Sequence, residues 1–163
     1  MCLVVAAEET EVAIAGTGAA FVAGGKALAD AATLTSAAFA SSYEAVKVST
    51  IASLKSEGLT EAHHIIQNAA VKNIPGYSET AAPGIQLPGP SYDASTPHGA
   101  ATAVQKQAGG GTYGAERRIA YKALRIAGLR SKDARAVVEF ADKYFHGLGV
   151  TTSTQTRIPG NRP

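Results

Sequence analysis

The sequence predicts an α+β protein that is mostly helical, in which a small ββα unit is flanked by additional helices. Two short apolar runs with the length of strands, residues 63–66 and 84–87, are separated by segments rich in proline and glycine. Three helical patterns follow them along the chain. With 163 residues, the chain is long enough for one domain with a sizeable core.

Residues 1–60 differ in composition from the rest of the chain. They are dominated by Ala, Ser, Thr and Val without alternation, and their apolar positions suit two or three helices separated near the sequences GTG and AGG. The longest uncharged stretch there is shorter than the ~18–20 apolar residues of a membrane span. We therefore expect a soluble protein with no membrane span, whose residues 1–60 form a helical extension or linker. Close helix packing is favoured over a role in membrane passage.

Cysteine usage limits the kinds of site that the chain can build. The only cysteine is Cys2, so an internal disulfide and a cysteine-rich zinc module are both excluded. No basic region precedes an apolar run in the manner of a cleavable secretory signal. Any bound metal must use His, Asp, Glu or Asn side chains.

The net charge of +2 hides an asymmetry along the chain. Residues 1–60 carry a net charge of −3 and residues 61–163 a net charge of +5, with the basic side chains concentrated in 106–135. A polyanion is therefore a plausible partner, and a solvated basic surface is the alternative. The basic residues of 106–135 are Lys106, Arg117, Arg118, Lys122, Arg125, Arg130, Lys132 and Arg135.

The first of the three helical patterns follows the second apolar run. In STPHGAATAVQKQAGGG, Thr96 suits the N-cap, Pro97 the first helical position, and the glycine run the end of the helix. This placement puts His98 in the first turn. Between the two apolar runs, the sequence NAAVKN suits one helical turn.

Two further helices are predicted over residues 114–130 and 131–149. In the first, Ile119, Ala123 and Ile126 suit an apolar face. The second is expected to begin with Ser131 as its cap. Its predicted buried residues are Ala134, Val137, Val138, Ala141 and Phe145, and it is expected to stop at Gly147. A separate cationic face of the first helix comprises Arg118, Lys122 and Arg125, at positions i, i+4 and i+7.

The adjacent histidines His63 and His64 mark a candidate site at the end of a strand. Neighbouring strand residues point to opposite faces, so the two imidazoles diverge there. One could hold a divalent cation while the other takes a proton from water. Since a metal needs more than one protein ligand, His98 on the following helix is the obvious second.

Three segments carry a resemblance to a known family. EAHHIIQ, PGIQLPG and TPHGAATAVQKQ together resemble the ββα-metal core of the HNH/Endonuclease VII (His-Me finger) superfamily of nucleases. They are most similar to the AHH/SHH-type toxin domains at the C-termini of bacterial polymorphic and Rhs effectors. The resemblance is strongest over residues 61–107 and leaves residues 1–60 outside.

The resemblance implies roles for the three histidines. His64 would be the general base that activates water, and His63 and His98 would be metal ligands, although the roles of His63 and His64 could be exchanged. Many superfamily members carry Asn or a second His further along the metal-binding helix. Here the only amides beyond His98 in that helical segment are Gln105 and Gln107, so waters and substrate phosphate, or Asp93 or Glu61, would complete the coordination.

The implied function is that of an antibacterial endonuclease toxin that hydrolyses DNA with one divalent ion, Mg²⁺, Mn²⁺, Zn²⁺ or Ni²⁺. The implied partners are the nucleic acid and a cognate immunity protein, and a secretion system would deliver the toxin into the target-cell cytoplasm. Residues 61–147 would form the nuclease domain, with 1–60 belonging to a larger effector and 148–163 a tail. The expected nucleic-acid contacts are Arg117, Arg118, Lys122 and Arg125.

Two other functions remain open at this point. One is an RNase that uses His64 and a basic groove without metal; the other is a non-catalytic module that binds nucleic acid or protein. Metal dependence separates the DNase from the RNase, and activity separates both from the binding module. Tyr77, Tyr92 and Tyr113 are expected to be packing residues rather than platforms for bases.

Overall fold

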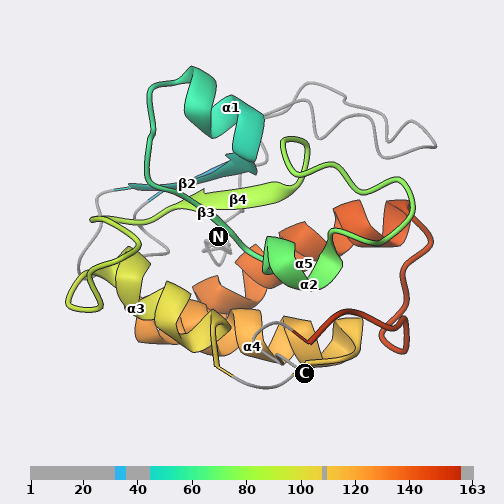
Figure 1. The fold of residues 1–163 in the computed structure, drawn as a ribbon. Helices are drawn as coiled ribbons and strands as arrows, with labels where there is room; N and C mark the ends of the chain where they lie inside the picture. Colours follow the sequence, from blue (N-terminus) through green and yellow to red (C-terminus); the bar gives the residue numbers. More distant parts are fainter. Residues whose placement is uncertain (1–31, 36–44, 108–109, 159–163) are drawn as a thin grey trace, which may run out of the picture.

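The computed structural model describes residues 32–35, 45–107 and 110–158, which form a four-stranded antiparallel sheet and five helices (Figure 1). The prediction of a mostly helical α+β fold is confirmed. In chain order, the elements are β1 (Ala32–Thr35), β2 (Ala45–Thr50), α1 (Ile51–Ser56), β3 (Ala62–His64), α2 (Asn68–Val71), β4 (Pro83–Gln86), α3 (Pro97–Gln105), α4 (Tyr113–Ile126) and α5 (Ser131–Gly147).

The strand order β1-β2-β4-β3 makes β4 an inner strand, between β2 and the strand that carries the two histidines. Ile85 pairs with Val48 of β2 and with His63 of β3, whereas Gly84 pairs with His64. Directly opposed residues share a face of the sheet, and neighbours along a strand alternate between faces. His63 therefore lies on the same face as Ile85 and Val48, and His64 on the same face as Gly84.

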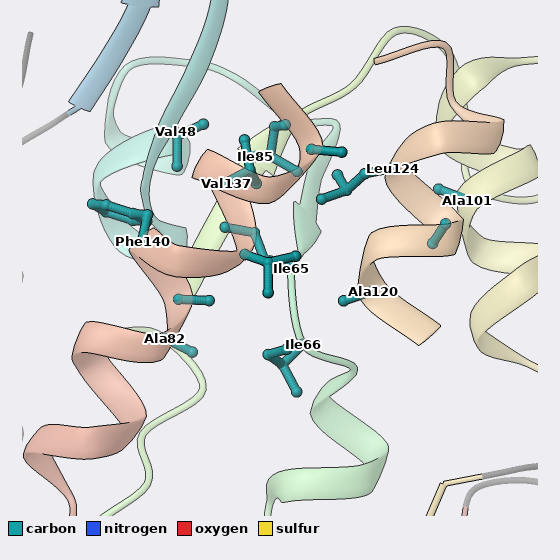
Figure 2. Close-up of a cluster of buried hydrophobic side chains, with 14 of the residues drawn as sticks. Val48, Ile65, Ile66, Ala82, Ile85, Ala101, Ala120, Leu124, Val137 and Phe140 are labelled. Carbon is teal, nitrogen blue, oxygen red and sulfur yellow. The ribbon is translucent and has the colours of Figure 1, made fainter. Parts of the chain in front are cut away.

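The face that carries Ile85 packs on the C-terminal helices. Val137 and Phe140 of α5 lie against this face of the sheet, together with Leu124 of α4, and Ile65 packs among them (Figure 2). All of these side chains are buried. His63 is thus a polar residue on the face of the sheet that meets the main core of the domain.

The opposite face is covered by the short helix α1 (Figure 1). Its two buried residues, Ile51 and Leu54, pack over Gly84, where a Cβ would lie 2.4 Å from Ile51 Cδ1. This close approach explains why the sequence has glycine at the centre of β4. The sheet therefore lies between α1 on one side and the C-terminal helices on the other.

The prediction that residues 1–60 are helical is wrong for the strands β1 and β2. In residues 45–50, valine or threonine occupies every second position, a pattern that favours a strand, and the segment is held by pairing with β4, which is distant in sequence. The sheet therefore includes residues from before position 61. The GTG and AGG sequences lie outside the described residues, and the domain boundaries stay a prediction.

The predictions for the middle of the chain are confirmed, with small shifts at the ends of the strands. The run at 63–66 is a strand only from Ala62 to His64, and the expected helical turn is α2. Helix α3 begins as predicted after Thr96, whose Oγ1 accepts a hydrogen bond from the amide of Gly99 at 3.1 Å. The tail makes one isolated β-bridge, between Thr112 and Gln155.

Two details of the last helices differ from the prediction. Ile126, expected on the apolar face of α4, is 56% exposed, because the buried stripe runs through Ala120, Ala123 and Leu124 and continues to Ala127. Ser131 is the first residue of α5, and the N-cap is the residue before it. The predicted buried residues of α5 are all buried, and the helix ends at Gly147. No helix in the described parts of the chain is both long and apolar enough to cross a membrane.

One carboxylate is buried on α4 without an ion-pair partner in the part of the chain that the structure describes. Glu116 is 1% exposed, and a Cβ on Gly110 would lie 1.9 Å from its Oε1. Burial raises the pKa of Glu116 from 4.5 to about 7, and the Gly111 amide and the Gln67 side chain oppose this shift only in part. The carboxyl group is therefore better tolerated in the fold when it is protonated.

We predict that Glu116 makes the protein less stable as the pH rises. A carboxyl whose folded-state pKa is raised stabilises the fold fully below its unfolded value of 4.5, and this contribution is lost as the pH rises through about 7. Glu116→Gln removes this titration. The melting temperature of the parent relative to that of the variant should therefore fall between pH 4.5 and pH 7. Glu139→Gln, at an exposed position, serves as control. A difference in melting temperature between the parent and Glu116→Gln that does not vary with pH would contradict the prediction.

Candidate active site

The structure brings His63 of β3 and His98 of α3 together. Their ring centroids are 5.1 Å apart, and the rings meet edge to face. Both residues are buried, with 5% and 7% of their surfaces exposed. The Nε2 atom of His63 is buried and has no hydrogen-bond partner among the residues that the structure describes. A buried polar atom without a partner is costly, so the position calls for a functional explanation.

Burial also determines the charge state of His63. Burial, together with smaller contributions from the nearby His98 and His64, lowers the pKa of the His63 imidazole from 6.5 to about 3. His63 is therefore neutral at ordinary pH, which is the form of histidine that ligates metals.

His98 is positioned by the start of α3 and by Glu61. Its backbone amide donates to the carbonyl of Pro88 at 3.1 Å, and its Nδ1 lies 3.1 Å from Glu61 Oε2. An ionised carboxylate only accepts hydrogen bonds, so Nδ1 carries the proton of this bond. In the neutral ring, Nε2 then keeps its lone pair. A carboxylate that fixes the tautomer in this way is a common partner of metal-binding histidines.

His64 is the last residue of β3 and lies on the opposite face of the sheet, as the alternation of strand residues predicts. Its Nε2 lies 3.2 Å from the carbonyl oxygen of Glu79. A carbonyl can only accept, so Nε2 carries the proton and Nδ1 of the neutral ring is the free acceptor. Burial lowers the pKa of His64; the carbonyl and the carboxylate of Glu79 oppose this shift, and the ammonium of Lys55 on α1 supports it.

Gln105 fixes α3 against the strand that bears the histidines. Its buried Nε2 donates to the carbonyls of His64 at 3.1 Å and of Ile65 at 3.2 Å. The end of α3 is thereby tied to the end of β3, while the start of α3 carries His98. The side-chain amide of Gln105, one of the two amides noted beyond His98 on this helix, therefore has its partners on the main chain.

The two further carboxylates considered as ligands differ in their surroundings. Glu61 contacts His98, whereas Asp93 accepts hydrogen bonds from the amide and hydroxyl of Ser95 in its own exposed loop. Among the described residues, no group of three or more His, Cys, Asp or Glu side chains could hold a metal ion. His63 and His98 alone fit a divalent ion as a pair of imidazole ligands, with the orphaned Nε2 as the supporting observation.

The predicted basic residues of α4 fall into two groups. Arg118, Lys122 and Arg125 are exposed on the outer side of the helix. Arg117 is half-buried and forms a bidentate ion pair with Asp142 of α5, with Nε 2.7 Å from Oδ1. Arg117 thus joins α4 to α5. Its position beside Arg118 in the sequence does not predict this contact.

Other features of the site had no signal in the sequence. The Glu79 carbonyl that accepts from His64 lies fifteen residues away in a loop. Lys55 precedes the segment in which the site was expected. The tyrosine predictions hold for Tyr113, which is buried, and for Tyr77, which stacks on Phe145. Tyr92 is wrongly predicted as a packing residue, because it is 87% exposed.

A strand ending in two histidines, an antiparallel partner strand and a helix with a third histidine define a chain of the ββα nuclease class. A family model, Tox-SHH, described as an HNH/Endo VII superfamily toxin with a SHH signature, matches residues 57–146. The chain belongs to this family of nuclease-like toxin domains. The residue before His63 and His64 is here Ala62. No curated protein and no solved structure matches the chain.

We predict that Gly99 is required for the position of His98. A Cβ on Gly99 would lie 1.8 Å from the carbonyl oxygen of Asp93, which is backbone, so the 93–96 loop or the start of α3 would have to move. Gly99→Ala should therefore cost about 1–3 kcal/mol of unfolding free energy, measured by denaturant titration. Ala103→Ser, at an exposed position of the same helix, is the control. Equal stability of the two variants would contradict the prediction.

Proposed function

We propose that the chain is a metal-dependent endonuclease that hydrolyses the phosphodiester bonds of DNA. The observation that carries this proposal is the buried Nε2 of His63, without a hydrogen-bond partner, beside the ring of His98. Membership of the HNH/Endo VII superfamily agrees with it, because these nucleases generally use a divalent metal and act on nucleic acid.

His63 and His98 would hold the ion through their Nε2 atoms. For His98, the Glu61 carboxylate supports this choice, because it occupies Nδ1. Two neutral imidazoles favour Zn²⁺, Ni²⁺ or Mn²⁺, and Mg²⁺ would rely more on oxygen ligands from water and phosphate. A divalent ion bound here would supply a Lewis acid that neutralises charge on the phosphate.

His64 is the proposed general base. The Glu79 carbonyl holds the proton on Nε2, so Nδ1 is free to accept a proton from a water molecule. The oxygen of this water forms a bond to phosphorus while the bond from phosphorus to the leaving sugar oxygen breaks. Lys55, whose charge acts on His64, adds a positive group on the same side of the sheet.

The exposed face of α4 would hold the nucleic-acid backbone. Arg118, Lys122 and Arg125 share this face, and opposite charge at phosphate spacing is the general basis of backbone binding. Arg117 is left out of the proposed contact set because its guanidinium pairs with Asp142.

The toxin family suggests the biological setting. We propose that a bacterial secretion system delivers the domain into the cytoplasm of a target cell, and that the producing cell protects itself with an immunity protein. Co-expression with candidate neighbouring gene products, scored by growth, addresses this part of the proposal.

Incubation with supercoiled plasmid and with total RNA, each with Mg²⁺, Mn²⁺, Zn²⁺ or Ni²⁺ and with chelator, tests the proposed activity. Plasmid cleavage that chelator abolishes supports the metal-dependent DNase. Cleavage of RNA that persists in chelator would favour the RNase, and no cleavage of either substrate would favour a binding module.

The general-base assignment predicts that His64→Ala lowers the rate of plasmid cleavage by about 10²–10⁴-fold. Folding and metal-free DNA binding should be preserved, because the side chain is only partly buried at the end of a strand. The matched control is His146→Ala, an exposed histidine on α5. Single-turnover cleavage is the measurement, and a folded His64→Ala variant that cleaves at the parent rate would eliminate the assignment.

The metal-pair assignment predicts that His63→Ala and His98→Ala each weaken metal binding in calorimetric titrations. Glu61→Gln should weaken it by about 10–100-fold, because it removes the carboxylate that orients His98. Glu61 lies at the surface side of the pair, so this variant is informative even if His63→Ala fails to fold. Metal affinity that is unchanged in Glu61→Gln and His98→Ala would place the ion elsewhere.

A further inference from the structure

A hollow of about 540 Å³ lies between α4 and α5, and of its lining residues only Arg118 has a proposed role above. Its size falls within the range of small-molecule sites, roughly 300–1,000 Å³. We name it the α4–α5 pocket. The residues that line it are Arg117, Arg118, Tyr121, Arg135, Val138 and Glu139.

The cations of the pocket are not equivalent. Arg117 forms its bidentate pair with Asp142, and the charge of Glu139 acts on it as well. Arg118 and Arg135 are exposed, and neither has an ion-pair partner among the described residues. The pocket therefore presents two guanidinium groups, one from each helix, whose charges are not neutralised by a carboxylate in an ion pair among the described residues and can attract an anion.

Tyr121 gives the pocket a fixed aromatic wall. Its hydroxyl lies 2.8 Å from the hydroxyl of Ser131 at the start of α5, and the guanidinium of Arg135 also hydrogen-bonds to it. The ring packs partly against the core, and the buried Val138 lies beside it as an apolar lining residue. A ring held at its tip and along its edge loses little entropy when a flat group stacks on it.

We propose that the α4–α5 pocket binds one unstacked nucleotide of the substrate strand, with its base on Tyr121 and Val138 and its phosphate between Arg118 and Arg135. The ligand must combine a flat apolar face with a negative charge, and a nucleotide has both. This inference rests on the proposed function only in taking nucleic acid as the ligand.

The position of Arg118 favours nucleic acid over an acidic protein segment. Arg118 lines the pocket and also begins the exposed series that continues with Lys122 and Arg125 along α4. A strand whose phosphates follow this series reaches the pocket with the next nucleotide. An acidic peptide would satisfy the guanidinium groups and leave the face of Tyr121 without a matching group.

The proposal has a consequence for the form of the substrate. In a regular duplex the bases are stacked and paired, so a base enters the pocket only where it is unpaired or flipped out, at a cost in free energy. Single-stranded DNA has no such cost. The pocket should therefore make the chain bind a single strand more tightly than a duplex of the same sequence.

The experiment measures binding by fluorescence anisotropy in chelator, so that cleavage does not interfere. The probes are a labelled single-stranded oligonucleotide, the matching duplex, and a single strand of the same length with abasic sugars. The parent is expected to bind the normal strand more tightly than the other two. Tyr121→Leu should weaken binding of the normal strand about tenfold, and should abolish the preference over the abasic strand.

Matched variants separate stacking from charge and from folding. Tyr121→Phe keeps the ring and should retain the preference for the normal strand over the abasic one. Arg135→Gln should weaken binding of both single strands, whereas Lys143→Gln, an exposed lysine on the same helix, should not. Melting temperatures show whether each variant is folded.

Several results would overturn the proposal. The pocket holds no base if Tyr121→Leu binds the normal single strand as tightly as the parent does. The same conclusion follows if Tyr121→Leu loses as much affinity for the duplex and the abasic strand as for the normal strand. Binding of a polyglutamate peptide, with no binding of DNA, would assign the pocket to an acidic protein partner. If plasmid cleavage depends on His64 but the Tyr121 and Arg135 variants bind DNA as the parent does, only the pocket proposal is overturned. If the variants change binding as expected but the parent cleaves neither DNA nor RNA, only the nuclease proposal is overturned.

Discussion

The hydrogen bonds from Gln105 to the main chain at the end of β3 hold the candidate site together. They tie the last turn of α3 to the carbonyls of His64 and Ile65, in a position from which water is excluded. A buried amide that lost these partners would carry a desolvation cost, so α3 has one favourable position along the strand. The start of α3 is then placed so that His98 reaches the ring of His63.

The sheet gives the two adjacent histidines different surroundings. Register with Ile85 turns His63 into the core, where burial keeps it neutral, while register with Gly84 turns His64 toward α1 and the Glu79 carbonyl. The side-chain period of a strand enforces this separation, because a slip of one residue would exchange the two faces. One dipeptide thus places one imidazole in the core and the other in a more accessible position, which suits the roles of metal ligand and general base proposed above. Gly84 keeps α1 close over the second imidazole.

Local signals in the sequence were sufficient for the parts of the fold that depend on neighbouring residues. Thr96 and Pro97 mark the start of α3, and the pair of histidines marks the end of a strand, because caps and alternation act over a few residues. Strand β2 was missed because its pairing with β4 is non-local and the residues before it are rich in alanine. Ile126 was placed on the wrong face because its periodicity fits two adjacent helical stripes, and packing on α5 selects the other one.

Residue type and spacing drew attention to His63, His64 and His98, and the structure brings the rings of His63 and His98 together. The roles of the three histidines stay predictions. The groups that contact them, Glu61 and the Glu79 carbonyl, follow from the tertiary fold. Nothing in the sequence distinguishes Arg117, which pairs with Asp142, from Arg118, which is exposed.

Helix α4 shows why charge in a sequence and charge available to a ligand are different quantities. Three successive residues differ in their surroundings: Glu116 is buried with a raised pKa, Arg117 is paired with Asp142, and Arg118 faces outward. The helical rotation of 100° per residue produces this division, because each step turns the next side chain toward the core, toward α5 or toward solvent. Only the outward cations contribute to binding a polyanion without a cost to the fold. Under the proposals made above, the outer face of α4 and the adjoining pocket can therefore change in evolution, and with them the choice of nucleic acid, while the core and the histidine pair remain as they are.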